Sequence, residues 1–131
     1  MDSRPSRRYG RAVTLEESLA AHLDAIRRRD LAALAATVAP DEVVLVTARG
    51  EVFTTTERFL ALHRDRFAST TWSIATELPH HRVGADLATC VLKLDYRDAP
   101  DVRQESILSL VFRRVGDRWL LVQDQNTPIR S

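Results

Sequence analysis

The sequence predicts an α+β fold in which three helical segments come first and a mostly antiparallel sheet follows. Up to about residue 67, apolar side chains recur every three or four positions, a pattern that is typical of amphipathic helices. From residue 70 onward the period changes to two, as in strands that bury one face. With 131 residues, 44% of them hydrophobic, the chain fits one domain that folds without disulfide bonds.

The first predicted helix begins at a capping box made by Thr14 and Glu17. Its apolar stripe holds His22 together with four aliphatic side chains, Leu15, Leu19, Leu23 and Ile26. Residues 1–12 lack apolar periodicity, so we expect a flexible arm there and a single domain over 13–131.

A second, shorter helix is predicted to start at the cap Asp30 and to end before Pro40, because proline cannot continue a helix. It carries Leu31, Leu34 and Val38, and it forms a helical hairpin with the first helix.

A pair of short strands and a third helix follow. A β-branched run at 43–46 meets a turn at Gly50 and resumes at Val52, which predicts a hairpin or a bulged strand pair. Thr54 and Glu57 form a second capping box, so we expect the third helix to begin there. Its apolar face is Phe59, Leu62, His63 and Phe67.

Four longer strands are predicted at 70–82, 86–97, 103–115 and 118–127, paired in sequence as an antiparallel meander. Alternation places Leu120 and Val122 on the same face as Asp124 and Asn126. The inward set is Cys90, Leu92, Leu94, Tyr96, Ser106, Leu108, Leu110, Asp124 and Asn126. The outward set is Thr89, Val91, Ile107, Val111, Trp119 and Leu121.

Composition narrows the range of partners. Because 19 basic residues are nearly matched by 18 acidic ones, no field of one sign exists to hold nucleic acid. No apolar run approaches the roughly 18 residues of a membrane span, and Cys90 has no second cysteine to pair with. We therefore expect a cytoplasmic protein without a nucleic-acid or membrane partner.

The order of these elements resembles the nuclear-transport-factor-2-like superfamily, in particular its SnoaL-like and ketosteroid-isomerase-like branch, and it is also similar to the association domain of calmodulin-dependent kinases. The resemblance rests on three stretches, 25–41 with its Asp30 break and Pro40 exit, 47–60, and the ending 116–127. It implies a cone-shaped fold in which a strongly curved sheet and the helices enclose one cavity, with polar residues of the last strand facing inward.

Asp124 is the foremost candidate for a catalytic residue, since it interrupts an otherwise apolar strand and shares a face with Asn126. A carboxyl group in an apolar cavity has a raised pKa, which suits a general base or acid. The alternative is that Asp124 ends the strand at the solvated rim.

His22 is the second catalytic candidate, because a histidine on the first helix could exchange a proton with Asp124. Both His22 and His63 could equally be core residues satisfied by one hydrogen bond. The adjacent His80 and His81 point to opposite faces of a strand, so no metal site is expected. The candidates for ligand binding are Asn126, His63, Trp72, Tyr96, Ser106, Leu108 and Leu110.

The sequence has no glycine-rich phosphate loop, no G-x-S-x-G elbow and no paired-cysteine metal site. Together with the resemblance, this leads us to expect a cofactor-independent isomerase, cyclase or dehydratase of secondary metabolism that acts on a small apolar or aromatic ligand. The alternative is a non-catalytic binding or assembly module. A homodimer is expected in either case, since the outward set is too apolar to face water.

Overall fold

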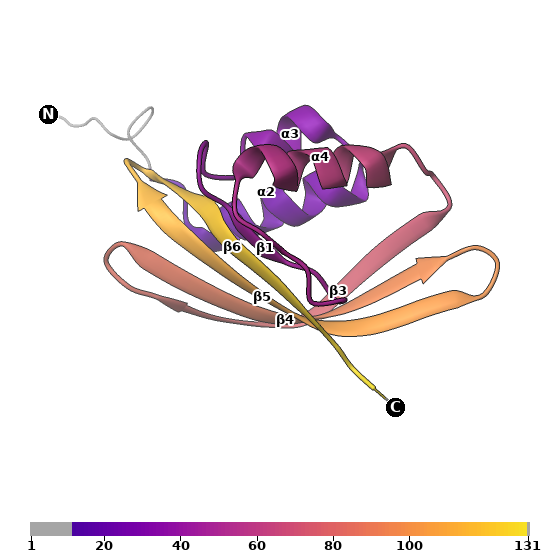
Figure 1. Cartoon of the computed structure of the whole chain (residues 1–131). Coiled ribbons are helices and arrows are strands. Elements are labelled where there is room, and N and C mark those ends of the chain that lie inside the picture. Colours follow the sequence, from indigo (N-terminus) through magenta and orange to yellow (C-terminus); the bar gives the residue numbers. More distant parts are fainter. Residues whose placement is uncertain (1–11, 131) are drawn as a thin grey trace, which may run out of the picture.

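A computed structural model describes residues 12–130, apart from the side chain of Leu78. Three helices, α2 (Leu15–Arg27), α3 (Leu31–Ala35) and α4 (Thr56–Phe67), cover one face of a curved sheet, as Figure 1 shows. The arm expected over 1–12 lies outside the described residues except for its last position. The predicted α+β architecture is confirmed.

The sheet has six strands in the order β2-β1-β6-β5-β4-β3. The four long strands β3 (Trp72–Val83), β4 (Leu87–Asp98), β5 (Val102–Val115) and β6 (Arg118–Pro128) form the predicted antiparallel meander. The short β1 (Val44–Val46) pairs in parallel with β6 and antiparallel with β2 (Val52–Phe53). This pairing places the β1–β2 turn beside the end of β6.

The caps of the helices follow the sequence closely, with one difference. Both hydrogen bonds of the Thr14–Glu17 capping box are present, and the Asp30 side chain accepts from the Ala33 N–H at 3.0 Å. Helix α4, however, is capped by Thr55 rather than Thr54, and its hydroxyl accepts from Arg58 N–H. Three successive threonines allow either choice, and only Thr55 is followed at once by helical backbone.

Helix α3 is shorter than predicted, because Val38 belongs to the sheet and not to the helix. The helix ends at Ala35, and Val38 forms a β-bridge with Leu121. On either side of that bridge, the Leu121 N–H donates to Thr37 and the Leu121 carbonyl accepts from Ala39. The chain therefore already pairs with β6 at Val38, two residues before Pro40, where the helix was predicted to end.

A β-bulge in β6 overturns part of the predicted alternation. Gln123 pairs with Val111 but Leu121 pairs with Phe112, so Val122 is an extra residue. Leu121 and Trp119 therefore share the inner face with Phe112, although the sequence predicted them to face outward. Below the bulge, Asp124 and Asn126 return to the inner face as predicted. Leu120 instead lies opposite Arg113, out of step with that face, and the extra residue Val122 packs against the core.

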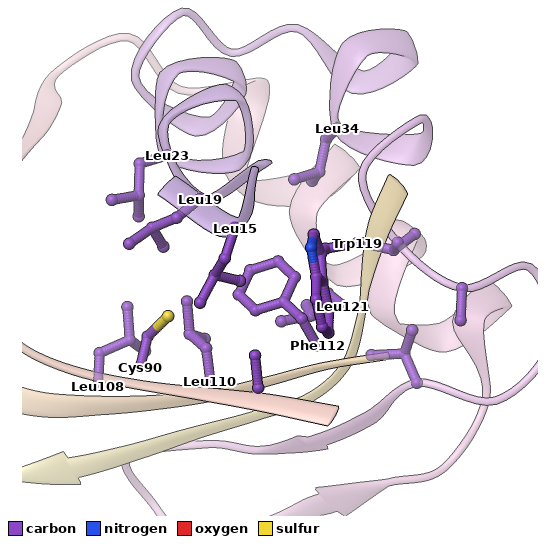
Figure 2. Close-up of a cluster of buried hydrophobic side chains, with 14 of the residues drawn as sticks. Leu15, Leu19, Leu23, Leu34, Cys90, Leu108, Leu110, Phe112, Trp119 and Leu121 are labelled. Atoms are coloured by element: carbon purple, nitrogen blue, oxygen red, sulfur yellow. The ribbon is translucent and has the colours of Figure 1, made fainter. Parts of the chain in front are cut away.

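The core lies between the helices and the inner face of the sheet, and its packing is shown in Figure 2. It fills the end of the sheet nearest the start of α2, where Leu121 and Phe112 are fully buried. Its other members in the figure include Leu15, Leu19, Leu23, Leu34, Cys90, Leu108, Leu110 and Trp119. The rest of the inner face is left for a cavity.

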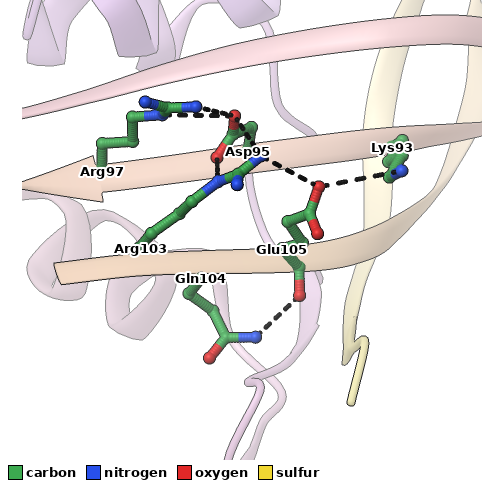
Figure 3. Close-up of polar contacts among 6 residues, drawn as sticks. All are labelled: Lys93, Asp95, Arg97, Arg103, Gln104 and Glu105. Atoms are coloured by element: carbon green, nitrogen blue, oxygen red, sulfur yellow. Dashed lines mark hydrogen bonds and ion pairs between the residues drawn. The ribbon is translucent and has the colours of Figure 1, made fainter. Parts of the chain in front are cut away.

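The outer face of the sheet is part apolar and part charged. Arg103 bridges Asp95 and Glu105 at 3.2 and 3.4 Å, and Arg97 and Lys93 join the same network (Figure 3). The arginine hydrogen bonds hold the pKa of Asp95 below its ordinary value. Farther along the strands the outward residues become apolar, with Val91 40% exposed.

Candidate functional site

A cavity of about 780 Å³ lies between the inner face of the sheet and helices α2 and α4. Cavities of this size accommodate drug-sized ligands. Its walls are mainly aliphatic and aromatic, and its polar side chains come from β5, β6, α4 and the β1–β2 turn. The lining comprises Leu23, Ile26, Leu45, Thr47, Ala48, Arg49, Glu51, Leu62, His63, Arg66, Phe67, Trp72, Ile74, Leu94, Tyr96, Val102, Gln104, Ser106, Leu108, Asp124 and Asn126.

The polar residues of the sheet meet on two neighbouring strands. Asn126 lies opposite Leu108, and Asp124 lies opposite Leu110, one inward position farther along. Ser106 precedes Leu108 on the same face of β5. These pairings bring a carboxyl, an amide and a hydroxyl group to one side of an otherwise apolar space.

Asp124 is 5% exposed, and burial raises the pKa of its carboxyl group to about 7. The Asn126 amide donates to Asp124 Oδ1 at 3.1 Å, which opposes the shift but does not cancel it. Among the described residues, Asn126 is the only side chain that donates to this carboxyl group. Its second oxygen, Oδ2, is therefore available to a ligand, and near pH 7 the group can take up or release a proton.

Ser106 is a second buried polar group of the cavity, and it has no hydrogen-bond partner among the described residues. It is 2% exposed, it lines the cavity, and its hydroxyl makes no hydrogen bond with any described residue. Buried hydroxyl groups are ordinarily hydrogen-bonded, so an unpaired one that faces a cavity fits a role in ligand binding.

His63 lines the cavity from α4, with its ring held against its own helix. Its Nδ1 donates to the Phe59 carbonyl at 2.9 Å, and the two rings pack with centroids 4.3 Å apart. Burial lowers the pKa of His63, so the ring is neutral and its Nε2 carries a lone pair. His63 is therefore equipped to accept a hydrogen bond from a ligand.

The structure does not bring His22 to the cavity. Its ring is 1% exposed and packs between Phe59 and Phe112. The Thr37 hydroxyl donates to the Leu34 carbonyl and accepts from His22 Nδ1 at 2.8 Å. Burial lowers the pKa of His22 to about 3, so it is a neutral core residue, which was the alternative reading of its position on the helix.

Aromatic rings line the far end of the cavity. Phe67, Trp72 and Tyr96 follow one another with centroids 6.2 and 6.3 Å apart and planes within 25° of parallel. The Trp72 indole N–H donates to the Arg66 carbonyl at 2.9 Å, and the Arg66 guanidinium lies 5.0 Å from the centre of the Tyr96 ring. The three rings offer a wall against which a flat ligand can pack.

Arg29 fixes the position of Trp72 from outside the cavity. Its guanidinium lies 4.2 Å from the centre of the Trp72 ring and donates to the backbone carbonyls of Trp72 and Ser69. The backbone of Arg29 has φ 56° at the end of α2, where the Asp30 N–H donates to Ala25 in a Schellman motif. This turn therefore joins the helices to the start of β3.

Seven of the predicted site residues share this cavity, namely Asp124, Asn126, His63, Trp72, Tyr96, Ser106 and Leu108. Leu110 is 1% exposed and belongs to the core instead, because it lies one inward position beyond Leu108. Arg66 and the residues of the β1–β2 turn also line the cavity and were not predicted from the sequence. Arg66 lies one residue before Phe67 on α4, so helical spacing from His63 would have suggested it.

The described residues contain no group of three or more His, Cys, Asp or Glu side chains placed to hold a metal ion. His81 contacts Glu16 at 3.1 Å, and His80 pairs with Val91 on the outer face, so the two histidines point apart as predicted. Over the same part of the chain, none of the helices has the length and apolar character needed to cross a membrane.

Helices on one face of a curved sheet, with a cavity between them that polar residues of the last strand line, define the nuclear-transport-factor-2-like class of α+β proteins. A model of the SnoaL-like domain matches residues 15–128, and the chain belongs to this family. No curated protein matches the sequence significantly.

Three solved structures illustrate the fold. A proposed calcium/calmodulin-dependent protein kinase type II association domain from Thiobacillus denitrificans is 19% identical, with a TM-score of 0.80 over 92% of this chain and 98% of that one. A proposed dehydratase of the NTF2-like family from Streptomyces avermitilis is 20% identical, with a TM-score of 0.79 over 89% and 95%. A proposed ketosteroid isomerase from Shewanella frigidimarina is 13% identical, with a TM-score of 0.73 over 84% and 91%. At these identities the likeness concerns the fold alone.

Proposed function

We propose that this SnoaL-like protein is a cofactor-independent acid–base enzyme that moves a proton on a small cyclic or aromatic carbonyl compound. The observation that carries the proposal is the Asp124 carboxyl group, which is buried in a mainly apolar cavity, has a pKa of about 7, and has one oxygen to which no described residue donates. The proposed dehydratase and the proposed ketosteroid isomerase among the similar structures support this class of reaction.

The reaction would begin with Asp124 as a carboxylate. Its free oxygen takes a proton from the carbon next to the substrate carbonyl, the C–H electron pair forms the enolate, and the carboxyl group becomes neutral. Asn126 has a second amide hydrogen, and Ser106 has a hydroxyl hydrogen, with which to stabilise the enolate oxygen. Asp124 then returns the proton to the same carbon or to a conjugated one.

Neither histidine is needed as an acid in this scheme. His22 is enclosed in the core, and neutral His63 offers an acceptor rather than a donor to the cavity. We therefore assign proton transfer to Asp124 alone and give His63 a part in orienting a ligand hydroxyl group.

Deuterium exchange tests the proposal. The protein is incubated in D₂O with 2-tetralone, a cyclic ketone with exchangeable hydrogens next to its carbonyl, and NMR follows their loss. We expect the parent to accelerate exchange over buffer and Asp124→Asn to lose about 100-fold or more of that acceleration. Asp101→Asn, a change of an exposed carboxyl group, serves as the matched control.

The competing function is a non-catalytic ligand-binding or assembly module. In the described part of the chain, Asp124 is the only buried carboxyl group that lines the cavity, because Glu51 at the cavity edge is exposed. The lack of a second buried carboxyl group favours this competing function. If Asp124→Asn exchanges 2-tetralone hydrogens at the parental rate while its melting temperature is not lowered, Asp124 is no acid or base. In that case we would conclude that the protein is a non-catalytic binding or assembly module.

We also propose that the chain forms a homodimer through the apolar part of its outer sheet face. Val91 is 40% exposed there, and Ile107 and Val111 are half-buried on the neighbouring strand. Burying such side chains against a second copy would remove apolar surface from water. Trp119 and Leu121 take no part, because the bulge in β6 places them in the core.

A further inference from the structure

The open edge of the cavity is cationic, which the proposed function does not use. Arg49, from the turn between β1 and β2, and Arg66, from α4, both line the cavity and are both exposed. Neither guanidinium has a carboxylate within ion-pair distance among the described residues. Glu51 also lines this edge, and its carboxyl group accepts from the Thr47 hydroxyl at 3.3 Å.

Arg66 is held in a defined place. Its guanidinium lies over the Tyr96 ring, and its backbone carbonyl accepts from the Trp72 indole. The neighbouring carboxyl group of Asp98 is already occupied, since it accepts from the Thr71 and Tyr96 hydroxyls and from Ala99 N–H. Arg66 is near enough to help lower the pKa of Asp98, but it forms no ion pair with this or any other described carboxylate. Its guanidinium can therefore still bind an anionic group that enters the cavity beside the aromatic wall.

The cavity therefore has three chemically distinct parts. Asp124, Asn126 and Ser106 are the buried polar groups on the sheet, and the three rings and the aliphatic side chains form the walls. Two arginines and Glu51 line the open edge, which leaves an excess of one positive charge there. Guanidinium groups bind carboxylates through charge-assisted hydrogen bonds, which are stronger than neutral ones.

We propose that the ligand of this cavity is a flat carboxylic acid whose carboxylate is bound by Arg66 and Arg49 while its other polar end faces Asp124. The inference rests on the proposed function in that it names a substrate class, a carbonyl-bearing aromatic or alicyclic acid, for the same cavity. Recognition of the carboxylate is nevertheless separate from proton transfer, because it uses different residues.

Binding is measured with 2-naphthylacetic acid and with 2-naphthylacetamide, which has nearly the same shape but no charge. The chain has two tryptophans, so its indole N–H region in an NMR spectrum holds two signals. Trp72 lines the cavity and Trp119 lies in the core, where it serves as an internal control. We expect both compounds to shift the Trp72 signal, and the acid to bind about tenfold more tightly than the amide.

Variants identify the source of that preference. Arg66→Gln and Arg49→Gln should each reduce the preference for the acid, with the larger loss at Arg66, while both compounds still bind. Arg64→Gln removes an exposed arginine of the same helix that does not line the cavity, so it should keep the full preference. Asp124→Asn should keep or increase the preference, because it removes a negative charge from the cavity and neither arginine, and this separates a failure here from a failure of the proposed proton transfer.

The proposal is overturned if acid and amide bind equally well to the parent, or if neither shifts Trp72 at millimolar concentration. It is also overturned if Arg64→Gln loses as much preference as Arg66→Gln, since the effect would then be the general charge of the surface. If Arg66→Gln lowers the melting temperature, the preference for the acid is judged from Arg49→Gln instead. No described residue makes a hydrogen bond or ion pair with the Arg49 side chain, so its loss should not destabilise the fold.

Discussion

The Asn126 amide donates a 3.1 Å hydrogen bond to the Asp124 carboxyl group, two residues earlier on the same face of β6. This one donor replaces only part of the hydration that Asp124 loses on burial, so its pKa remains near 7. The same arrangement has consequences for the stability of the fold as well as for its chemistry.

Asp124 and His22 make stability respond to pH in opposite directions. Because the pKa of Asp124 is raised to about 7, its contribution is fully present below the unfolded value near 4 and is lost as pH rises through 7. Because the pKa of His22 is lowered to about 3, its contribution is present above about 6.5 and is lost as pH falls. Between pH 4.5 and 7.5 the two effects oppose each other.

Asp124→Asn should therefore expose the dependence due to His22, to which His63 adds in the same direction because burial lowers its pKa as well. We expect the free energy of unfolding of this variant, measured in urea, to fall by about 2 to 3 kcal/mol from pH 7.5 to 4.5, while the parent changes much less. At pH 7.5 the variant should be the more stable protein. An Asp124→Asn curve that follows both the parent and Asp101→Asn at every pH would disprove the raised pKa.

Ser106 and Thr56 form a matched pair of buried hydroxyl groups with opposite expectations. Thr56 donates to the Ala39 carbonyl at 2.7 Å and accepts from Val43 N–H, whereas Ser106 has no partner among the described residues. Thr56→Val should cost about 1 to 3 kcal/mol and Ser106→Ala about 0.5 kcal/mol or less, both measured in urea. Equal costs would mean that the Ser106 hydroxyl is bonded within the protein.

Arg29 offers a test of how the cavity wall is held. Arg29→Ala removes the side-chain bonds to Ser69 and Trp72 and keeps a left-handed backbone, so we expect a loss of about 2 kcal/mol. Arg29→Gly loses the same bonds but relieves the backbone, and it should melt at a higher temperature than the alanine variant. If Arg29→Ala melted at a higher temperature than Arg29→Gly, the left-handed backbone at Arg29 would not be a source of strain.

The proposed homodimer is tested by light scattering at micromolar concentration. We expect twice the 14.8 kDa mass of one chain for the parent, and a single-chain mass for Val91→Lys, which places a charge in the apolar part of the outer face. Val83→Lys changes an exposed valine at the β3–β4 turn and should leave the dimer intact. A parent of 14.8 kDa would count against the proposal.

Most of the fold could be predicted because it follows from local patterns. The capping box at Thr14, the cap at Asp30 and the change of period after residue 70 each act over a few residues. The features that were predicted wrongly depend on contacts between distant segments of the chain. The bulge at Val122 lies where the neighbour of β6 changes from residues 37–39 to β1, and nothing within β6 itself signals that exchange.

The site shows the same division. Alternation brought Asp124, Asn126 and Tyr96 to the inner face, but it could not tell cavity from core, so Leu110 and His22 were expected at a site that they do not line. That distinction depends on how far α2 and α4 stand from the sheet. Arg49 reaches the cavity only because β1 pairs in parallel with β6, a pairing between residues far apart in the sequence, such as Leu45 and Asp124.

The ionisation of Asp124 distinguishes a buried carboxyl group that can act as a base from a solvated one. Carbon NMR of protein labelled in its aspartate carboxyl groups follows each group through a pH titration, and Asp124→Asn identifies the signal. The account predicts a midpoint of about 7 for Asp124. A midpoint near the ordinary value of about 4 would show that the carboxyl group is solvated, and it would contradict both the buried site and its proposed use as a base.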